Sequence, residues 1–364
     1  MLRSILLLTI ASFWGFCAKA QSKPFTITAY FAGSLEEINQ YDPTKLTHII
    51  FSFCHLRGNR LHVNNSNDTA RIQQLVKLKK TAPQLKVLLS LGGWGGCATC
   101  SDVFSTDAGR KEFAASVKSL NDYFGTDGID LDWEYPAVQG YPGHTFRAED
   151  KQNFTSLIRD LRSSLGAKNE ISFAAGGFQR FIDEAIEWLP VMQLVDRVNL
   201  MSYDLVHGYS TTTGHHTALY STSQQKESAD NAIQALIKKG VPAGKIVIGA
   251  AFYAREWEGV AEGNNGLYQS GKFKRSVGFK DFPVQYSKQS GYESFWDSEA
   301  KAPYLYNKAK GLFVTFDDPS SLAEKVTYVV EKGLNGIMFW ELSNDMPASG
   351  LVDAIHKASG KKPK

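Results

Sequence analysis

The stretch "DGIDLDWEYP", from Asp127 to Pro136, places four carboxylates within eight residues of an otherwise apolar run. Side chains alternate between the two faces of a strand, so Asp130, Asp132 and Glu134 share one face and the intervening apolar side chains share the other. In a parallel barrel the helix-facing side is apolar, and the acidic face must therefore point into the barrel. Asp127 has the opposite parity and lies where the strand begins, which indicates a structural role.

The rest of the chain repeats this alternation of strand and helix. Eight runs rich in β-branched and aromatic residues are candidate strands, at residues 25–31, 48–54, 86–94, 128–136, 170–178, 197–204, 245–253 and 333–342. Amphipathic stretches, several ending in glycine as helices often do, separate them at residues 69–83, 109–125, 149–166, 225–240 and 320–333. Eight strands with helical crossovers favour a parallel sheet, and eight strands close a (β/α)8 barrel. We predict an α/β fold, a (β/α)8 TIM barrel.

One interval breaks this alternation. Residues from about 258 to 316 are rich in Gly, Tyr and Phe and have no helical period. A structureless loop of that length is improbable in a compact domain. We therefore expect a small α+β insertion in the seventh βα connection. Because βα loops lie at the active face of a barrel, the insertion should form one wall of a cleft.

The composition excludes several classes of protein. The chain has 364 residues, of which 43% are hydrophobic, and this suits a large buried core rather than a disordered or fibrous chain. Its 40 basic and 37 acidic residues give a formal net charge of +3. A balance this close, without a long Lys/Arg run, does not indicate a nucleic-acid partner.

The N-terminal segment resembles an export signal. Arg3 precedes the apolar run "ILLLTIASFWGF", and the small residues of "AKA" end at Ala20. This pattern predicts a signal peptide over residues 1–20 and a mature domain over residues 21–364. The run is too short to span a bilayer, so a membrane anchor is the weaker interpretation. We expect a soluble exported protein, secreted or periplasmic.

Three cysteines remain after that segment. Cys97 and Cys100 lie in one glycine-rich loop and could form a local disulfide, which would leave Cys54 buried and free. A zinc site would need two further ligands that "GGCATCSD" does not supply. A disulfide or inert thiols are therefore favoured over a metal site.

The three inward carboxylates of the opening stretch suggest acid–base chemistry. Like-charge repulsion and desolvation in a confined space raise carboxyl pKa values. The outermost group, Glu134, is then a candidate proton donor near neutral pH. Two other interpretations remain open from spacing alone: a structural acidic cluster, and a site for Mg²⁺ or Ca²⁺.

The same stretch resembles the DxxDxDxE signature of the family 18 glycoside hydrolases, the chitinase family. Other segments are similar to family strands in the same order: "LSLGGW" at residues 89–94, "MSYD" at 201–204 and "GIMFWEL" at 336–342. The resemblance covers essentially the whole mature chain. The insertion resembles the small domain that deepens the cleft in one branch of these chitinases.

The resemblance implies a substrate-assisted, retaining mechanism without a metal or cofactor, in which the substrate's N-acetyl oxygen is the nucleophile. Glu134 would protonate the glycosidic oxygen and later deprotonate water. Asp132 would bind the acetamide N–H and stabilise positive charge, and Asp130 behind it would share its proton. The hydroxyl of Tyr203 would hold the acetamide oxygen.

The remaining implied contacts are to sugar or to the inner carboxylate. Trp340 would form an apolar floor beneath the distorted sugar, and Asp204 would touch the same sugar. Tyr30 and Ser90 match positions that hydrogen-bond the inner Asp. Further expected sugar contacts are Trp94 on the leaving-group side, Met201, Arg255 and, in the insertion, Tyr292, Trp296 and Asp297. The histidines His207, His215 and His216 are interpreted as cleft lining or a structural turn.

These observations predict a secreted chitinase that hydrolyses β-1,4 bonds between N-acetylglucosamine units. The expected partners are chitin or its oligosaccharides, with no nucleic acid, no membrane anchor and a monomeric state. Two alternatives remain. One is an endo-β-N-acetylglucosaminidase that acts on the chitobiose core of N-glycans. The other is a chitinase-like lectin that binds without cutting, although such members often lose the acid that is intact here.

Overall fold

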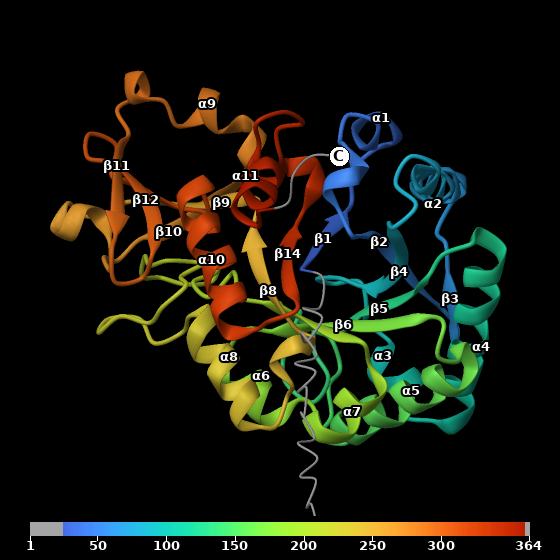
Figure 1. Cartoon of the computed structure of the whole chain (residues 1–364). Helices are drawn as coiled ribbons and strands as arrows, with labels where there is room; N and C mark the ends of the chain where they lie inside the picture. The colour runs from blue at the N-terminus through green and yellow to red at the C-terminus, as the bar shows by residue number, and fades with distance from the viewer. Residues whose placement is uncertain (1–24, 361–364) are drawn as a thin grey trace, which may run out of the picture.

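A computed structural model describes residues 25–360 and contains a closed barrel of eight parallel strands (Figure 1). Around the barrel the strands follow the order β1-β14-β8-β7-β6-β5-β4-β2, and pairing of β1 with β2 completes the circle. The predicted (β/α)8 TIM barrel is confirmed. The strands are β1 (Thr26–Phe31), β2 (His48–Arg57), β4 (Lys86–Gly92), β5 (Gly128–Asp132), β6 (Glu170–Gly176), β7 (Arg197–Met201), β8 (Ile246–Ala251) and β14 (Gly336–Trp340).

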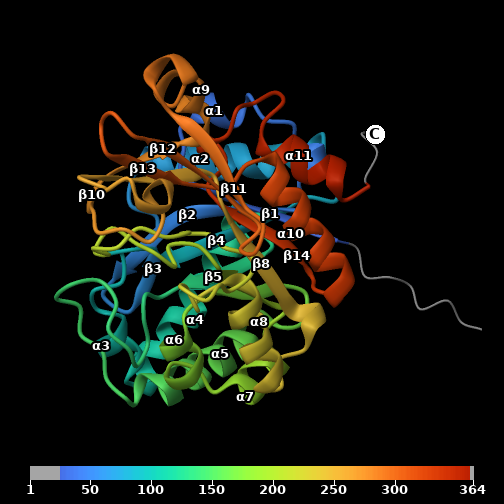
Figure 2. The ribbon, with the colours of Figure 1, turned by 90° about the vertical axis from the view of Figure 1, so that its left-hand side faces the viewer.

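Helices follow the strands and cover the outside of the barrel. In both ribbon views α4 to α8 lie together on one side of the barrel strands, opposite the insertion (Figures 1 and 2). The helices are α1 (Leu35–Ile38), α2 (Ser66–Lys77), α3 (Cys100–Phe104), α4 (Asp107–Phe124), α5 (Asp150–Leu165), α6 (Gln179–Glu184), α7 (Trp188–Leu194), α8 (Ala229–Lys238), α10 (Pro319–Lys332) and α11 (Leu351–Ala358).

Local sequence accounts for several helix ends. The side chain of Thr106 accepts a hydrogen bond from the Gly109 backbone N–H and so caps the start of α4. Asp318 forms a capping box at the start of α10, and Pro319 occupies the first turn, where its missing N–H costs nothing. Both helices end at a glycine in the left-handed conformation, Gly125 and Gly333.

The seventh βα connection carries the predicted insertion as a five-stranded antiparallel sheet of order β10-β9-β13-β12-β11. Its start differs from the expected boundary at about residue 258, because β9 already begins at Tyr253. Only Phe252 separates the two sheets, and no turn residue marks the change from one to the other. The insertion contains β9 (Tyr253–Glu258), β10 (Lys272–Gly278), α9 (Phe282–Gln285), β11 (Glu293–Asp297), β12 (Ala302–Asn307) and β13 (Leu312–Thr315). A further short strand, β3 (Arg60–His62), pairs with the end of β2 and was not expected.

The apolar core has two parts in the barrel. The larger lies between strands and helices, and a smaller cluster fills the barrel interior. The interior cluster contains Tyr30, Ile50, Leu88, Val247 and Met338, with Met201, Tyr203 and Trp340 packed at its open end. The barrel is therefore a packed core whose upper layer is formed by predicted site residues.

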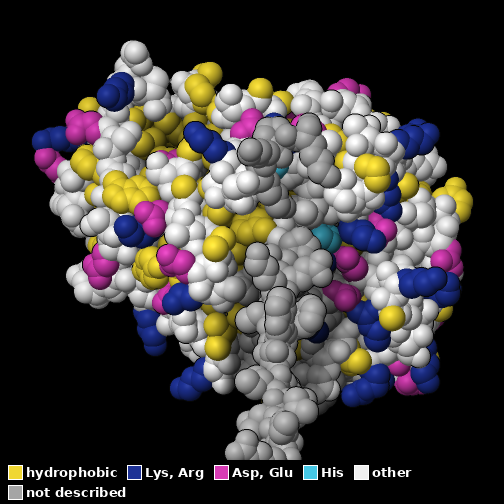
Figure 3. Space-filling model, in the orientation of Figure 1, with side chains coloured by type: hydrophobic (Ala, Val, Ile, Leu, Met, Phe, Trp, Pro, Cys, Tyr) yellow, Lys and Arg dark blue, Asp and Glu magenta, His cyan; other side chains and the backbone are white. Residues whose placement is uncertain are grey.

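Cys97 and Cys100 form a disulfide, and Cys54 is buried and free, as the loop sequence suggested. Within residues 25–360 there is no cluster of three or more His, Cys, Asp or Glu side chains arranged to hold a metal ion. No helix in that range is both long enough and apolar enough to cross a bilayer. The expected signal peptide, residues 1–20, lies outside the described residues. On the face drawn in Figure 3, acidic and basic side chains are interspersed, as the nearly balanced charge implies.

A buried ion pair connects α10 to the base of the insertion. The Lys325 ammonium lies 2.6 Å from the Asp317 carboxylate, and both side chains are fully buried. Lys325 also donates to Thr217, and Asp317 accepts from the backbone N–H of Ala251 at the end of β8. The pair thus holds three segments of chain together at the point where the barrel strand leads into the insertion.

We expect Lys325→Met to lower the free energy of unfolding by about 3–5 kcal/mol, because it leaves the Asp317 charge buried without its partner. Chemical denaturation monitored by circular dichroism measures this loss. Lys332→Met, an exposed substitution on the same helix, is the matched control and should change stability by less than about 1 kcal/mol. Equal stability of the two variants would contradict the importance of the pair.

Candidate active site

The innermost carboxylate, Asp130, lies in a complete hydrogen-bond shell at the centre of the barrel. Tyr30 and Ser90 donate to Oδ2 at 3.0 and 3.2 Å. Ser172 and Asn199 donate to Oδ1 at 2.6 and 3.0 Å. Burial raises the pKa of Asp130, and the four hydrogen bonds oppose that rise. Tyr30 and Ser90 therefore occupy the positions predicted for them.

Asp132, two residues further along β5, faces the same interior but lacks such a shell. Its Oδ1 atom is buried and has no hydrogen-bond partner. Burial raises the pKa of Asp132 well above its usual range, and the charges of Glu134 and Asp130 raise it further. A buried acceptor without a donor is costly unless a bound molecule supplies one. Asp132 is therefore poised to accept a hydrogen bond from a ligand.

Glu134 lies just beyond the end of β5. Burial raises the pKa of Glu134 to about 7; a hydrogen bond with Tyr135 opposes this rise, and the charge of Asp204 adds to it. A carboxyl group with that pKa is protonated in a large fraction of molecules near neutrality and can donate its proton. The three carboxylates thus form the inward line that strand parity predicted.

Aromatic side chains surround the end of this line. Trp340, the last residue of β14, stacks on Phe53 with ring centroids 5.5 Å apart. Its ring also lies 6.1 Å from that of Tyr30. The Tyr203 hydroxyl lies 3.9 Å from the Met338 sulfur, a weak contact that leaves it free to bind a ligand. Met201 lies beside these rings at the open end of the interior cluster.

Asp204 follows β7 in a left-handed backbone conformation with φ of 55°. Its Oδ1 accepts a hydrogen bond of 2.8 Å from Nε of Arg255, and a second guanidinium nitrogen binds Oδ2 at 2.5 Å. The buried His216 ring nitrogen Nδ1 lies 3.4 Å from Oδ1. Although burial acts to raise the pKa of Asp204, these two partners lower it below its usual range. Asp204 is therefore a fixed negative charge beside Glu134.

The glycine-rich loop after β4 borders a pocket of about 350 Å³. The first glycine of the pair is required sterically, because Gly92 has φ of +112° and a Cβ there would lie 2.1 Å from the Asp132 carbonyl oxygen. The loop then presents Trp94, which is 49% exposed and meets the Tyr141 ring edge-on at 5.5 Å. The pocket is lined by Phe53, His55, Gly92, Gly93, Trp94, Gly95, Gly96 and Tyr141.

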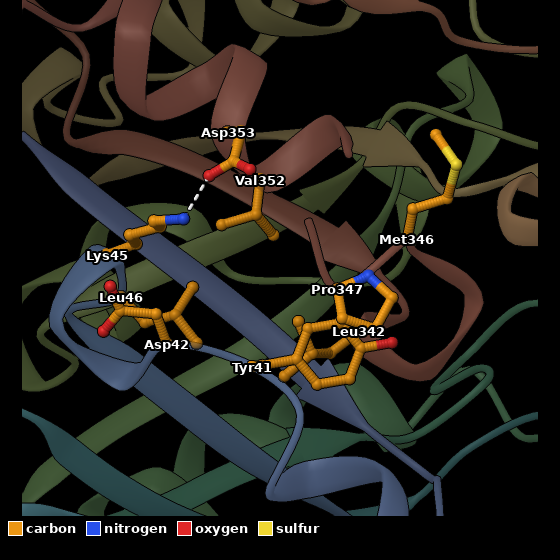
Figure 4. Close-up of a pocket in the computed structure, with 9 residues that line it drawn as sticks. All are labelled: Tyr41, Asp42, Lys45, Leu46, Leu342, Met346, Pro347, Val352 and Asp353. Atoms are coloured by element: carbon orange, nitrogen blue, oxygen red, sulfur yellow. Dashed lines mark hydrogen bonds and ion pairs between the residues drawn. The ribbon is translucent and has the colours of Figure 1, made fainter. Parts of the chain in front are cut away.

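A second cavity, near the C-terminal helix α11, is much smaller. Figure 4 shows its lining, in which the Lys45 ammonium points to the Asp353 carboxylate. Its volume of about 10 Å³ is no larger than one water molecule requires. The larger pocket beside the acid strand is therefore the relevant one for a ligand.

Two of the expected sugar contacts in the insertion have structural partners instead. The hydroxyl of Tyr292 donates to the buried Glu256 carboxylate at 3.0 Å, and this residue lies in the insertion's own core. Asp297 pairs with His215 at 3.0 Å and accepts from backbone N–H groups after β11. Trp296 is 40% exposed and remains available for a ligand.

The structure adds several site residues that the sequence did not predict. Ser172 and Asn199 complete the Asp130 shell from β6 and β7, and their parity in "EISFAAG" and "RVNLM" could have revealed them as inward-facing polar residues. Tyr135 follows Glu134 directly in the expected strand, so the sequence gives no sign of its hydrogen bond with the Glu134 carboxyl group. Phe53 was assigned only to a strand, although its ring forms the stacking partner of Trp340.

The family model described as "Glycosyl hydrolases family 18" matches residues 26–345 of this chain. The chain belongs to glycoside hydrolase family 18. This membership, together with relatives named as chitinases, supports a glycoside hydrolase, and the predicted family is confirmed.

Curated relatives of this family 18 chain include "Chitinase A1" of Niallia circulans, which is 33% identical over 84% of this chain and 53% of the relative. The chain thus spans about half the length of that protein. "Chitotriosidase-1" of Mus musculus is 32% identical over 84% of this chain and 68% of the relative. A solved family 18 N-acetylglucosaminidase from Paenibacillus barengoltzii is 36% identical, with a TM-score of 0.84, covering 92% of this chain and all of that one.

Proposed function

We propose that the chain is a chitinase that hydrolyses β-1,4 bonds between N-acetylglucosamine units with retention of configuration. The observation that carries this proposal is the pair formed by Glu134, with a pKa of about 7, and Asp132, with its buried and unpartnered Oδ1. Glu134 can supply a proton, and Asp132 Oδ1 can accept a hydrogen bond from an N–H group. A β-linked N-acetylglucosamine offers both a basic glycosidic oxygen and an acetamide N–H.

In the first step Glu134 donates its proton to the glycosidic oxygen while the acetamide carbonyl oxygen attacks the anomeric carbon. The C–O bond to the leaving sugar breaks, and a positively charged oxazolinium ring forms. Asp132 accepts the hydrogen bond of the acetamide N–H and stabilises that charge. In the second step Glu134, now a carboxylate, takes a proton from water, and the water oxygen attacks the same carbon to open the ring.

The neighbouring residues position the sugar. The Tyr203 hydroxyl holds the acetamide oxygen, and Trp340 provides an apolar ring beneath the sugar face, where C–H groups can stack. The neighbouring Asp130 raises the pKa of Asp132 and so favours its protonated form before the reaction. As the oxazolinium forms, Asp132 passes that proton to Asp130 and becomes the negative charge that stabilises the ring. Asp204 and Arg255 provide polar contacts at the mouth, and Trp94 receives the leaving-group side.

The proposed substrate is chitin or its soluble oligosaccharides, bound by a monomeric enzyme. Exposed Trp94 and Trp296 support an extended carbohydrate surface, because sugar faces stack on exposed aromatic rings. The proposed location is extracellular or periplasmic, which rests on the N-terminal sequence pattern. The disulfide between Cys97 and Cys100 is compatible with an oxidising compartment.

A second candidate is an N-acetylglucosaminidase, the activity named for the 36% identical Paenibacillus structure. Hydrolysis of the N-acetylglucosamine hexamer, followed by chromatography of early products, separates the two. Chitobiose and longer products support the chitinase. Release of N-acetylglucosamine monomer as the sole early product would indicate an N-acetylglucosaminidase that acts from the chain end. Cleavage of a high-mannose glycopeptide but not of the hexamer would indicate an endo-β-N-acetylglucosaminidase that acts on N-glycans. Binding of the hexamer without cleavage would assign the lectin.

The pKa of Glu134 predicts a pH dependence. Glu134 must be protonated to act as the acid, so kcat/KM should fall as the pH rises through about 7. Asp204→Asn removes a negative charge that raises this pKa and leaves the Arg255 cation unpaired, and both changes should move the alkaline limb to lower pH. A pH–rate profile measures the shift, with Asp122→Asn on the exposed face of α4 as control. An unmoved limb would contradict the electrostatic role of Asp204.

A further inference from the structure

The pocket beside the glycine-rich loop includes a histidine side chain as well as aromatic rings. His55 lies on β2 and lines the pocket together with Phe53, Trp94 and Tyr141. Its Nε2 atom lies 2.9 Å from the point where a Cβ of Gly96 would stand, and Gly96 also lines the pocket. Because Gly96 has no side chain, Nε2 is left uncovered on the pocket side.

The neighbouring Asn64 fixes which way its amide group points. The Nδ2 atom of Asn64 donates to the Phe53 carbonyl oxygen and to the Asp68 carboxylate, each at 3.1 Å. Both partners are acceptors only, so the amide nitrogen must face them. Asp68 is itself buried and paired with Arg71, which holds the carboxylate in place. The Asn64 Oδ1 atom therefore points towards His55.

This orientation determines the tautomer of the imidazole. Asn64 Oδ1 lies 3.0 Å from His55 Nδ1, and an amide oxygen can only accept, so Nδ1 must carry the hydrogen. In the neutral ring Nε2 then presents a lone pair. Nε2 makes no hydrogen bond to the described residues, and the pocket has space for a ligand that would provide one.

We propose that His55 is a specificity-determining residue that accepts, through Nε2, a hydrogen bond from the N-acetylglucosamine unit in this pocket. The donor is a hydroxyl or the acetamide N–H, the two donor types that this sugar carries. The aromatic rings can stack against many different sugars. The Nε2 atom of His55, held in one position, instead requires a sugar with a hydrogen-bond donor at that position. This inference rests on the proposed function, because it assumes an oligosaccharide in the cleft.

The test compares His55→Phe, which keeps a ring but removes the acceptor, with His55→Gln, whose amide oxygen can replace it. For the N-acetylglucosamine hexamer we expect His55→Phe to raise KM about 5-fold, the loss typical of one neutral hydrogen bond, with kcat within about twofold. His55→Gln should recover part of that loss. Asn64→Ala, which frees the ring to rotate and change tautomer, should lie between wild type and His55→Phe.

Three comparisons make the result decisive. His62→Phe, at the position paired with His55 across the β2–β3 hairpin and outside the pocket, should retain the wild-type KM. For an aryl chitobioside, whose leaving group is not a sugar, His55→Phe should raise KM less than it does for the hexamer. An unchanged KM, or equal losses on both substrates, would overturn the inference while the proposed function stands. A wild-type chain that does not cleave the hexamer would overturn the proposed function and the inference with it.

Discussion

Glu134→Gln should lower kcat on N-acetylglucosamine oligosaccharides by about 10³-fold or more, because the amide cannot donate the proton that the leaving oxygen needs. Glutamine has nearly the same shape and remains neutral, as the protonated acid is before reaction. Substrate binding and the fold should therefore be retained. Steady-state rates and calorimetric titration of the hexamer into the variant measure the two properties separately.

Glu184→Gln is a suitable control for this substitution. Glu184 is exposed on α6 and forms an ion pair with Arg180, far in sequence from the acid strand. It should keep wild-type kcat and stability. If Glu134→Gln were to retain full activity, the assignment of the acid would be wrong, and another group in the cleft would have to donate the proton.

Asp132→Asn should lower kcat by about 10²–10³-fold, the range found when a preorganised electrostatic partner of a developing charge is removed. Asparagine still offers a carbonyl oxygen to the acetamide N–H, so KM should change much less than kcat. What it cannot offer is the negative charge that stabilises the oxazolinium. The split between kcat and KM separates this role from simple binding.

The same strand supplies the control for that variant. Asp127 lies at the start of the strand segment with the opposite parity, where it accepts a hydrogen bond of 2.8 Å from the Val87 backbone N–H and pairs with Lys79. Asp127→Asn should reduce stability but leave kcat unchanged. Equal losses of kcat in the two variants would mean that charge anywhere on this strand matters, and would contradict the specific role of Asp132.

The fold was predictable because two features of the sequence were clear. Alternation within "DGIDLDWEYP" indicated which way the carboxylates point, and the eight strands separated by helices indicated the barrel. The boundary between β8 and β9 was not predictable, because extended aromatic residues continue from one sheet into the next with only Phe252 between them. The short hairpin strand β3 was also missed, since three residues carry too little pattern.

The part of the candidate site that lies on one strand was predictable from the residue pattern of that strand. The part to which several strands each contribute one residue was less predictable. Asp130, Asp132 and Glu134 could be placed by parity. The contacts of Ser172 and Asn199 with Asp130 could not, because they depend on β6 pairing with β5 and on Asn199 of β7 reaching Asp130 inside the closed barrel. Tyr292 was misjudged because an aromatic residue in an insertion can face the cleft or that insertion's own core. Its hydrogen bond to the buried Glu256 and its burial in the insertion's core decide between these.

The central claim is retaining, substrate-assisted hydrolysis at Glu134, and the anomeric form of the first products tests it most directly. Proton NMR of the N-acetylglucosamine hexamer during its first minutes of cleavage resolves the α and β anomers before they equilibrate. The account predicts that the newly formed reducing ends appear as the β anomer. Initial release of the α anomer would contradict the oxazolinium route and require direct attack by water.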